Sequence, residues 1–372
     1  MRVLLISHSA ALYGAQRSLL DLAIGLRRAK VEVVATVPEK GPLMDLLQRA
    51  QIEVRLLPCR NWVNSRGTYH WARKYVIAKR QANKASVWIS RDRFDIIHTN
   101  SLVTPVGAMA AKRAKLPHVW HVREGMPPVP DFFFLSFEKV RDFINETTTA
   151  MIGISQHSCV GMKEFCPEEK IRLIYNGPLD SSLANKTLPP KQTVGNPIRV
   201  LCVGRSSEAK GHDVAASSVA KLRAKGIPVT LTVAGEIPEV FEKKLRAILP
   251  EGLDLPGFVA DPTELYQTHD ILAMASKQEA FGRVTVEAMA NGCVVVGSAS
   301  GATPELVRHE VTGMLVEREN DEALAEAIFG LRNNQDLYES LRKAAHKDAY
   351  ARFTRERCAD EVADLYRKTL RA

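Results

Sequence analysis

Two glutamates in the C-terminal half are spaced so that they could meet a phosphorylated sugar. Glu279 follows a strand-like run at 271–275, and Glu287 lies about one and a half turns inside a helix predicted to begin near Gly282 and to end at Gly292. The first turn of such a helix presents unpaired backbone N–H groups and the positive end of the helix dipole, which favour an anion. A carboxylate has two acceptor oxygens, which suit the paired hydroxyls of a ribose or a hexose. Taken alone, a surface helix with two solvated glutamates would give the same pattern.

The glycine patterns and acidic pairs of several other phosphate-handling enzymes are absent. No two glycines are spaced as G-x-G, so neither the dinucleotide fingerprint nor a glycine-rich kinase loop is present. The G-x-x-x-x-G-K-[ST] loop, H-E-x-x-H and Asp-x-Asp are missing as well. The last absence weakens any scheme in which a divalent ion holds a diphosphate through paired aspartates. An enzyme with this sequence would have to bind phosphates with helix N-termini and basic side chains.

Short apolar runs alternate with longer amphipathic segments, which predicts βαβ units on a parallel sheet. Predicted strands in the first half lie at 3–6, 31–37, 53–57, 96–99, 119–121 and 151–155, and predicted helices at 15–28, 42–50 and 104–114. The pattern then restarts, because the run 199–204 echoes the run 2–7. Further strands are predicted at 229–234, 253–256, 271–275, 294–298 and 313–315. The expected fold class is therefore α/β, with two Rossmann-like doubly wound domains.

These elements predict an N-terminal Rossmann-like domain at 1–180 and a C-terminal Rossmann-like domain at 198–350. The residues between them, 181–197, are expected to be a linker, because prolines and small polar residues are frequent there. Residues 336–372 are predicted to be helical throughout, and the part at 351–372 could cross back to the first domain. Two such domains in series imply a central cleft at the carboxyl ends of their strands, where ligands are expected.

The composition is that of a soluble globular enzyme, with 45% apolar and 25% charged residues among 372. No run approaches the ~20 apolar residues that span a bilayer. The N-terminus lacks a signal-peptide pattern, so the sequence predicts a cytoplasmic protein. The six cysteines are scattered without a C-x-x-C pair, which favours reduced thiols.

The excess positive charge lies in the first half of the chain. The whole chain has a net charge of +9, of which residues 1–180 contribute +10 and the remainder −1. The stretch 60–93 has nine basic residues and one acid, interleaved with aromatic residues. Such a stretch fits an anionic membrane surface, a phosphorylated lipid or nucleic acid, and equally a solvated helical face. A location at the inner face of the cell membrane is therefore one expectation.

The E-x7-E spacing, with Phe281-Gly282 between the glutamates and Asn291-Gly292 after them, resembles the donor-binding motif of the retaining glycosyltransferases of family 4, which have the GT-B fold. Six further segments resemble motifs of this family, in the same order over nearly the whole chain. They are Tyr13-Gly14-Ala15-Gln16, His121-Val122-Arg123-Glu124, Ile174-Tyr175-Asn176-Gly177, Gly204-Arg205 with Lys210-Gly211, Gly257-Phe258-Val259 with Leu265, and Gly301-Ala302-Thr303-Pro304-Glu305.

The resemblance implies transfer of a sugar from a nucleoside diphosphate to a hydroxyl of a glycan or lipid-linked acceptor, with retention of the anomeric configuration. A UDP- or GDP-linked sugar would be the co-substrate, and neither a cofactor nor a metal is expected. Assembly of cell-surface polysaccharide or glycolipid is the expected role. The resemblance assigns catalysis to His121, Glu279, Arg205 and Lys210. It assigns donor binding to Gly14, Arg205, Lys210, Phe258, Leu265, Glu279, Phe281, Gly282, Arg283 and Glu287, and acceptor binding to Tyr13, Gln16 and Arg123.

Six positions depart from the family pattern, and two of them, Lys277 and Ala280, differ from the common residues around the first glutamate. Tyr13 and Gln16 replace a glycine and an acid in the turn of the first domain. Ser206 stands where an apolar residue normally follows the Gly-Arg pair, and Ala302 replaces a glycine.

Three other functions are compatible with parts of the sequence. A nucleotide-sugar 2-epimerase shares the two-domain architecture, but it needs further acid and base residues, for which no extra cluster is evident. A nucleic-acid-binding protein would use the basic first half of the chain. This alternative predicts that the protein binds polynucleotide in a salt-sensitive way and that Glu279→Ala has no effect on that binding. A nicotinamide dehydrogenase is disfavoured by the missing glycine fingerprint.

Overall fold

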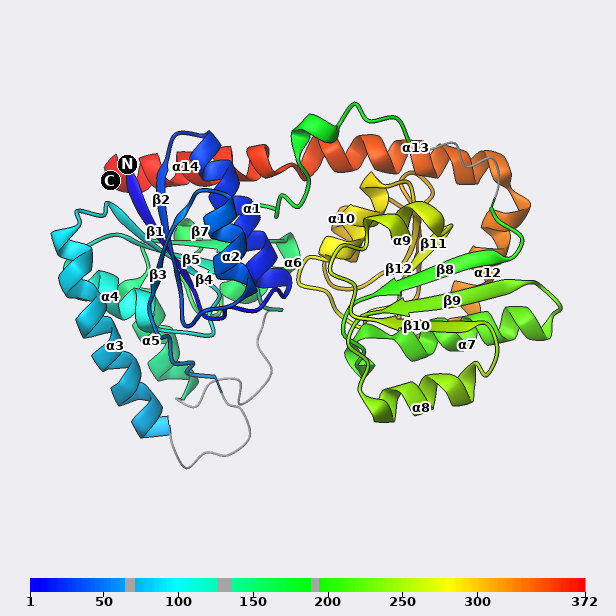
Figure 1. Ribbon diagram of the computed structural model, residues 1–372, viewed down its shortest axis with the longest axis horizontal. Coiled ribbons are helices and arrows are strands. Elements are labelled where there is room, and N and C mark those ends of the chain that lie inside the picture. Colours follow the sequence, from blue (N-terminus) through cyan, green and yellow to red (C-terminus); the bar gives the residue numbers. More distant parts are fainter. Residues whose placement is uncertain (64–70, 126–135, 189–193, 372) are drawn as a thin grey trace. The chain divides into compact units, whose positions relative to one another are not determined.

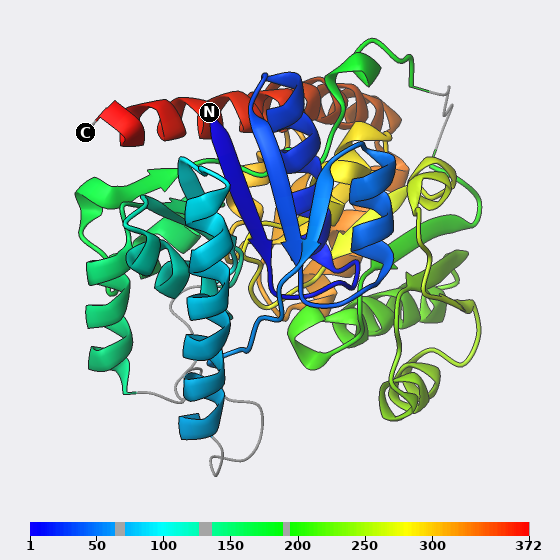
Figure 2. The ribbon, with the colours of Figure 1, turned by 60° about the vertical axis from the view of Figure 1, so that its left-hand side comes forward.

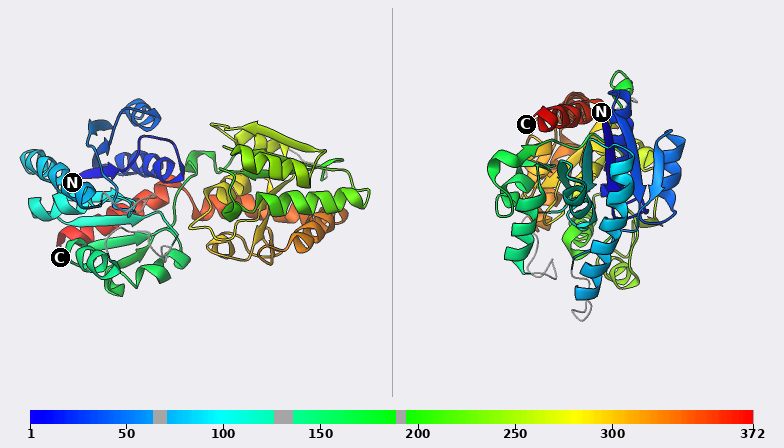
Figure 3. Two further views of the ribbon diagram at one scale, coloured as in Figure 1. Left: turned by 90° about the horizontal axis from the view of Figure 1, so that it is seen from below. Right: turned by 90° about the vertical axis from the view of Figure 1, so that its left-hand side faces the viewer.

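The computed structural model describes residues 1–63, 71–125, 136–188 and 194–371. The chain forms two compact units (Figure 1). Unit 1 contains Met1–Asp180 together with Thr354–Ala372, and unit 2 contains Ser181–Phe353. Each unit has one parallel sheet with helices on both of its faces (Figure 3). The predicted α/β fold class, with two doubly wound domains, is thus confirmed.

Unit 1 is built on a seven-stranded sheet with the order β3-β2-β1-β4-β5-β6-β7. Its strands are β1 (Arg2–Ser7), β2 (Glu32–Val37), β3 (Glu53–Leu56), β4 (Ile96–Asn100), β5 (His118–Val122), β6 (Ala150–Gly153) and β7 (Ile171–Leu173). All neighbouring strands pair in parallel, and Figure 2 shows β1, β2 and β3 side by side. The strand order reverses between β1 and β4, where such sheets bind ligands at the carboxyl ends of their strands.

Six helices of unit 1 lie between its strands in the sequence, and a seventh comes from the end of the chain. They are α1 (Gly14–Arg28), α2 (Pro42–Arg49), α3 (Trp71–Arg91), α4 (Val106–Ala114), α5 (Phe137–Thr147), α6 (Gln156–Met162) and α14 (Arg355–Arg371). One apolar cluster joins the sheet to α1 and α14, and another joins its other face to α3 and α4. The sheet is therefore covered on both faces, as its nearly continuous apolar strands require.

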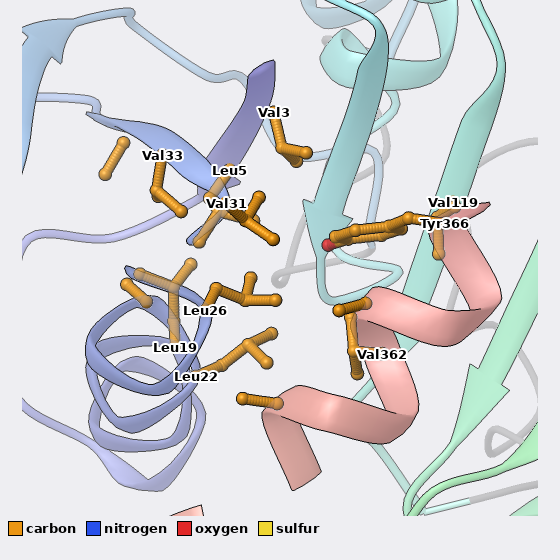
Figure 4. Close-up of a cluster of buried hydrophobic side chains, with 14 of the residues drawn as sticks. Val3, Leu5, Leu19, Leu22, Leu26, Val31, Val33, Val119, Val362 and Tyr366 are labelled. Carbon is orange, nitrogen blue, oxygen red and sulfur yellow. The ribbon is translucent and has the colours of Figure 1, made fainter. Parts of the chain in front are cut away.

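Helix α14 completes the core of unit 1 although it lies at the far end of the sequence. Gly25 of α1 lets it approach closely, because a Cβ on Gly25 would lie 2.6 Å from the Cβ of Ala359. Val362 and Tyr366 project from α14 into the same apolar cluster as Leu22 (Figure 4). Residues 354–372 thus belong physically to the first domain.

Unit 2 is built on a six-stranded parallel sheet with the order β10-β9-β8-β11-β12-β13. Its strands are β8 (Ile198–Val203), β9 (Val229–Ala234), β10 (Leu253–Gly257), β11 (Ile271–Met274), β12 (Val294–Ser298) and β13 (Met314–Val316). Its helices are α7 (His212–Ala224), α8 (Glu239–Ile248), α9 (Thr263–Thr268), α10 (Arg283–Ala290), α11 (Thr303–Leu306), α12 (Asp321–Asn333) and α13 (Gln335–Arg352). Here the strand order reverses between β8 and β11.

Two details of the predicted organisation differ from the structure. The described part of the expected linker at 181–197 belongs to unit 2, where Val194 is buried and its N–H donates to Gln335 at 3.0 Å. The helix expected over 336–372 is interrupted at Phe353, whose side chain is fully buried. The interruption lets Arg355 donate its N–H to the carbonyl of Leu179 at 2.7 Å in unit 1. Periodicity could not reveal it, because both flanking segments are good helices.

Candidate functional site

The loops after β8 and β11, at the reversal point of the unit 2 sheet, contact each other directly. Gly211 has a φ of 65°, and a Cβ there would lie 2.1 Å from the carbonyl oxygen of Ala275. Lys277 donates its backbone N–H to the carbonyl of Ala209 at 2.9 Å. Only glycine fits this approach, since any side chain would strike backbone. The two loops therefore hold Lys210 and Glu279 beside each other.

Lys210 and Glu279 form a half-buried ion pair at this position. The Nζ of Lys210 lies 2.5 Å from Oε1 of Glu279, and the hydroxyl of Ser276 donates to the same oxygen at 2.7 Å. The Glu279 side chain is 11% exposed and that of Lys210 is 37% exposed. An ammonium has three N–H donors, so Lys210 can hold Glu279 and still donate to an anion. The pair thus offers a cation and a carboxylate to one ligand.

A third loop, after β12, fixes the backbone of Glu279. A Cβ on Gly301 would lie 2.6 Å from the nitrogen of Glu279, and Ala302 donates its N–H to the carbonyl of Glu279 at 2.9 Å. Gly301 has a φ of 57°, whereas Ala302 has a φ of −85°. Because the second position needs no left-handed backbone, alanine replaces the family's glycine there without strain.

Helix α10 begins at Arg283, directly after its N-cap Gly282, which confirms the predicted start near Gly282. Gly282 has a φ of 93°, which an L side chain rarely adopts. The Phe281 side chain is buried against Phe353, with the ring centroids 5.8 Å apart. Phe281 can therefore face a ligand only through its backbone. The first amides of a helix have no intrahelical acceptor, so the start of α10 suits a phosphate.

Glu287 is held by two neighbours inside unit 2. The hydroxyl of Tyr266 donates to Oε2 at 3.1 Å, and Arg283 donates to Oε1 at 3.1 Å. Burial and the Glu287 carboxylate raise the pKa of Tyr266 well above its usual value, so the phenol keeps its proton. Each carboxylate oxygen has two lone pairs, so Glu287 can still accept from a ligand. Tyr266 was not identified from the sequence, although it directly follows the motif residue Leu265.

Arg205 and Phe258 lie on the surface of unit 2. The Arg205 side chain is 69% exposed, and its Nε lies 3.8 Å from Oε2 of Glu236. Phe258 is 60% exposed, and Leu265 is half-buried. Among the interactions of the described residues, none joins Arg205 or Phe258 to the Lys210–Glu279 pair. Both side chains are thus available to a ligand without being held in place.

The hydrogen bond of Ser206 explains why a polar residue stands where the family normally has an apolar one. Its hydroxyl lies 2.9 Å from Nδ1 of His212 at the start of α7, and both residues are buried. Burial, with Lys210 nearby, lowers the pKa of His212 to about 4, so the ring is neutral. This hydrogen bond braces the loop that carries Arg205 and Lys210. The only sign of this hydrogen bond in the sequence is a polar residue at a position that is normally apolar.

The candidate residues of unit 1 gather around a buried polar network at the carboxyl ends of β4 and β5. His121 on β5 is fully buried, and its Nδ1 lies 3.2 Å from Nε2 of His98 and 3.2 Å from Nη2 of Arg123. Arg123 also donates through Nε to Asn100 at 2.8 Å, and it binds the side-chain oxygen of Asn176. The network therefore includes His98 and Asn100, which sequence reasoning missed although a polar run in a buried strand is a signal for such a site.

The predicted acceptor residues around Gly14 differ in exposure. Gln16 is buried, and its Nε2 lies 3.4 Å from Nε2 of His8. Tyr13 is exposed at the start of α1, and Gly14 has open space where a side chain would begin. Arg123 bonds to Asn100 directly, and Gln16 reaches Asn100 through His8, whose Nδ1 lies 3.4 Å from the Asn100 carbonyl oxygen, whereas Tyr13 is exposed.

Two parallel, doubly wound α/β units in one chain are the architecture of the GT-B glycosyltransferases. Residues 13–178 match the family model "Glycosyltransferase Family 4", and residues 185–348 match the model "Glycosyl transferases group 1". These two matches account for most of the chain. The chain belongs to the family 4 glycosyltransferases.

Known relatives support the same assignment at low identity. The chain is 24% identical over 297 residues to an uncharacterised glycosyltransferase of Methanocaldococcus jannaschii, covering 74% of this chain and 76% of that protein. It is 31% identical over 182 residues to the D-inositol 3-phosphate glycosyltransferase of Corynebacterium urealyticum, covering 44% of this chain and 42% of that protein. For several of the relatives, the matched segment spans about half of the relative's length or less.

Solved structures share the fold over nearly the whole chain. Anabaena HepE in complex with UDP superposes with a TM-score of 0.82 at 23% identity, covering 99% of this chain and 100% of that chain. HepE in complex with UDP-glucose gives a TM-score of 0.81 at 23% identity, with the same coverage.

Proposed function

We propose that the protein transfers a hexose from a UDP- or GDP-linked sugar to a hydroxyl of a glycan or lipid-linked acceptor, with retention of configuration and without a metal ion. The observation that carries this proposal is the Lys210–Glu279 pair held beside the start of α10. The UDP and UDP-glucose complexes of HepE support a nucleotide sugar as the co-substrate. Relatives named as colanic acid biosynthesis glycosyltransferases support a role in cell-surface polysaccharide or glycolipid assembly.

The reaction breaks the bond between the anomeric carbon and the leaving diphosphate. Negative charge develops on the diphosphate, and Lys210, Arg205 and the first amides of α10 would stabilise it. These groups supply the positive charge that a metal supplies elsewhere, and the sequence has no Asp-x-Asp pair to hold one. The acceptor hydroxyl would attack the face from which the diphosphate leaves, and the departing phosphate would take its proton.

The remaining groups would orient the donor. Glu279 would accept from hydroxyls of the transferred sugar, and Glu287 from those of the ribose. Phe258 is exposed, as a side chain that contacts a nucleobase must be, and Leu265 lies near it in the sequence. His121 would donate a hydrogen bond to the transferred sugar.

A panel of nucleotide sugars tests the donor site. We expect one UDP- or GDP-sugar to raise the Tm, because a ligand at 100 times its Kd adds about 2.7 kcal/mol to the free energy of unfolding. Glu287→Gln should lose most of this shift. Glu242→Gln is the matched control, since it alters another carboxylate paired with an arginine four residues away. Absence of any shift across the panel would contradict the proposal, and turnover without an acceptor would favour the epimerase.

We also propose that the basic face of α3 holds the protein on an anionic membrane. Five exposed basic residues lie on this helix, and Val76 and Val87 are exposed between them. They are Arg73, Lys79, Arg80, Lys84 and Arg91. The rest of the stretch 60–93 includes residues 64–70, which lie outside the described residues. Basic and apolar side chains on one helix suit an anionic lipid surface. None of the described helices has the length and apolar character needed to cross a bilayer.

Flotation with liposomes tests this membrane contact. We expect the protein to float with anionic vesicles at low salt and to remain in the bottom fraction when the vesicles are zwitterionic. Added salt should release it from the anionic vesicles, because salt screens the charges. Lys79→Glu with Arg80→Glu should abolish flotation. Lys243→Glu with Arg246→Glu on α8 changes the net charge equally and should not. Equal loss in both double variants would show that only net charge matters.

A further inference from the structure

Tyr366 on α14 begins a chain of hydrogen bonds that ends at His121. Its hydroxyl lies 2.6 Å from Nδ1 of His98, and Nε2 of His98 lies 3.2 Å from Nδ1 of His121. All three side chains are fully buried. Figure 4 shows the Tyr366 ring projecting from α14 into the core of unit 1. A residue near the end of the chain is thus connected through one histidine to a predicted catalytic residue.

The Arg123 contact sets the direction of the hydrogen bonds in this chain. Arg123 has donors only, so the Nδ1 of His121 that it faces at 3.2 Å must be an acceptor. His98 must then carry its proton on Nε2, since two lone pairs would otherwise face each other. The Nδ1 of His98 is consequently an acceptor, and the Tyr366 hydroxyl donates to it.

The same arrangement fixes where the remaining proton of His121 lies. With Nδ1 as an acceptor, a neutral His121 carries its proton on Nε2. Burial, with Arg123 next, lowers the pKa of both His98 and His121 well below the usual value, so both rings are neutral. Burial also raises the pKa of Tyr366, which keeps its proton. Within the described residues, Nε2 of His121 is buried and has no hydrogen-bond partner.

We propose that Tyr366 and His98 are positioning residues, which together with Arg123 hold His121 in the orientation and tautomer that present an Nε2–H donor to the transferred sugar. A buried N–H without a hydrogen-bond partner destabilises the folded protein. The unpartnered Nε2–H of His121 is explained if an oxygen of a bound ligand accepts from it. His121 then acts as a fixed hydrogen-bond donor and not as a base. This inference rests on the proposed function for its substrate, but the tautomer itself does not depend on it.

The tautomer can be measured on the unmodified protein without substrate. In protein labelled with ¹⁵N-histidine, long-range ¹H–¹⁵N correlation spectra distinguish a protonated Nε2 from a protonated Nδ1, and His121→Asn and His98→Asn assign the signals. We expect both rings to be neutral with the proton on Nε2. A proton on Nδ1 of His121 would overturn the proposal, whether or not any nucleotide sugar is turned over.

Tyr366→Phe tests the contribution to sugar transfer. We expect kcat to fall at least about 10-fold with little change in the KM for the nucleotide sugar, because a misplacement of about 1 Å can cost about 10²-fold. The His98 signals should also show a mixture of tautomers, because His98 loses the hydroxyl that donates to its Nδ1. Tyr338→Phe is the matched control, since Tyr338 is also fully buried and donates to a backbone carbonyl, that of Asp270, at 3.1 Å. It should lower the Tm similarly and leave kcat and the His98 spectrum unchanged.

The outcomes separate this inference from the proposed function. Equal losses of kcat in Tyr366→Phe and Tyr338→Phe would reduce Tyr366 to a structural residue and overturn the inference. If the wild-type protein transfers no sugar from any nucleotide, the proposed function fails while the tautomer result still stands. If Tyr366→Phe does not fold, the wild-type spectrum alone decides the tautomer.

Discussion

Replacing Lys210 with methionine is expected to lower kcat for sugar transfer about 10²- to 10³-fold, the loss found when one preorganised donor is removed from a developing anion. The variant should also bind free nucleoside diphosphate more weakly. Methionine keeps the length of the side chain but removes its charge. It also leaves the half-buried Glu279 carboxylate without its cation, so the site would repel a diphosphate. Initial rates with the nucleotide sugar and calorimetry with the nucleoside diphosphate measure both effects.

The control for this variant is Lys221→Met on α7. Lys221 is also 37% exposed, and its Nζ lies 2.9 Å from a carboxylate oxygen of Asp321. This variant removes a lysine that pairs with both Asp321 and Glu322, away from the loops after β8 and β11, and we expect both kcat and affinity to stay within about twofold of wild type. A Lys210→Met enzyme with wild-type kcat would refute the assignment of Lys210 to the diphosphate.

Glu279→Gln is expected to lower kcat/KM about 10²-fold, because a hydrogen bond to a charged group is worth up to ~3 kcal/mol. Glutamine keeps the size of the side chain, and its amide oxygen can still accept from Ser276 and Lys210. It cannot supply the negative charge that would bind sugar hydroxyls and stabilise the positive charge on the sugar ring. Affinity for UDP or GDP without a sugar should therefore change little, in contrast to Lys210→Met.

Two comparisons make the Glu279 result specific. Glu339→Gln on α13 also alters a carboxylate in an ion pair, here with Arg342 at 3.1 Å, and should leave transfer unchanged. In the double variant of Lys210 and Glu279 the two losses should not add, because the side chains are in contact. Additive losses, or equal weakening of UDP and UDP-sugar binding by Glu279→Gln, would mean that Glu279 does not contact the sugar.

The fold and the neighbourhood of the donor site were predictable from local sequence signals. Buried parallel strands are nearly continuous apolar runs, so alternation with helices revealed both sheets. The start of α10 was predictable because Gly282 needs a left-handed backbone. Among the strands, the exception is β7, three half-exposed or exposed residues that have no apolar run to mark them.

The partners within the site were not predictable, because they come from distant parts of the chain. The Lys210–Glu279 pair depends on Gly211 meeting the end of β11, which is a contact of backbones. The link between Tyr366 and His98 spans 268 positions. In the sequence, a buried tyrosine that donates a hydrogen bond looks like any other core residue of an amphipathic helix.

The return of the chain to unit 1 after Phe353 also affects the order of events during synthesis. Domains usually fold one after another as they leave the ribosome, the N-terminal one first. Here the apolar face of α1 that meets α14 stays uncovered until the final 19 residues, 354–372, have been translated. The whole of unit 2 is made in between, so the second domain can finish folding before the first.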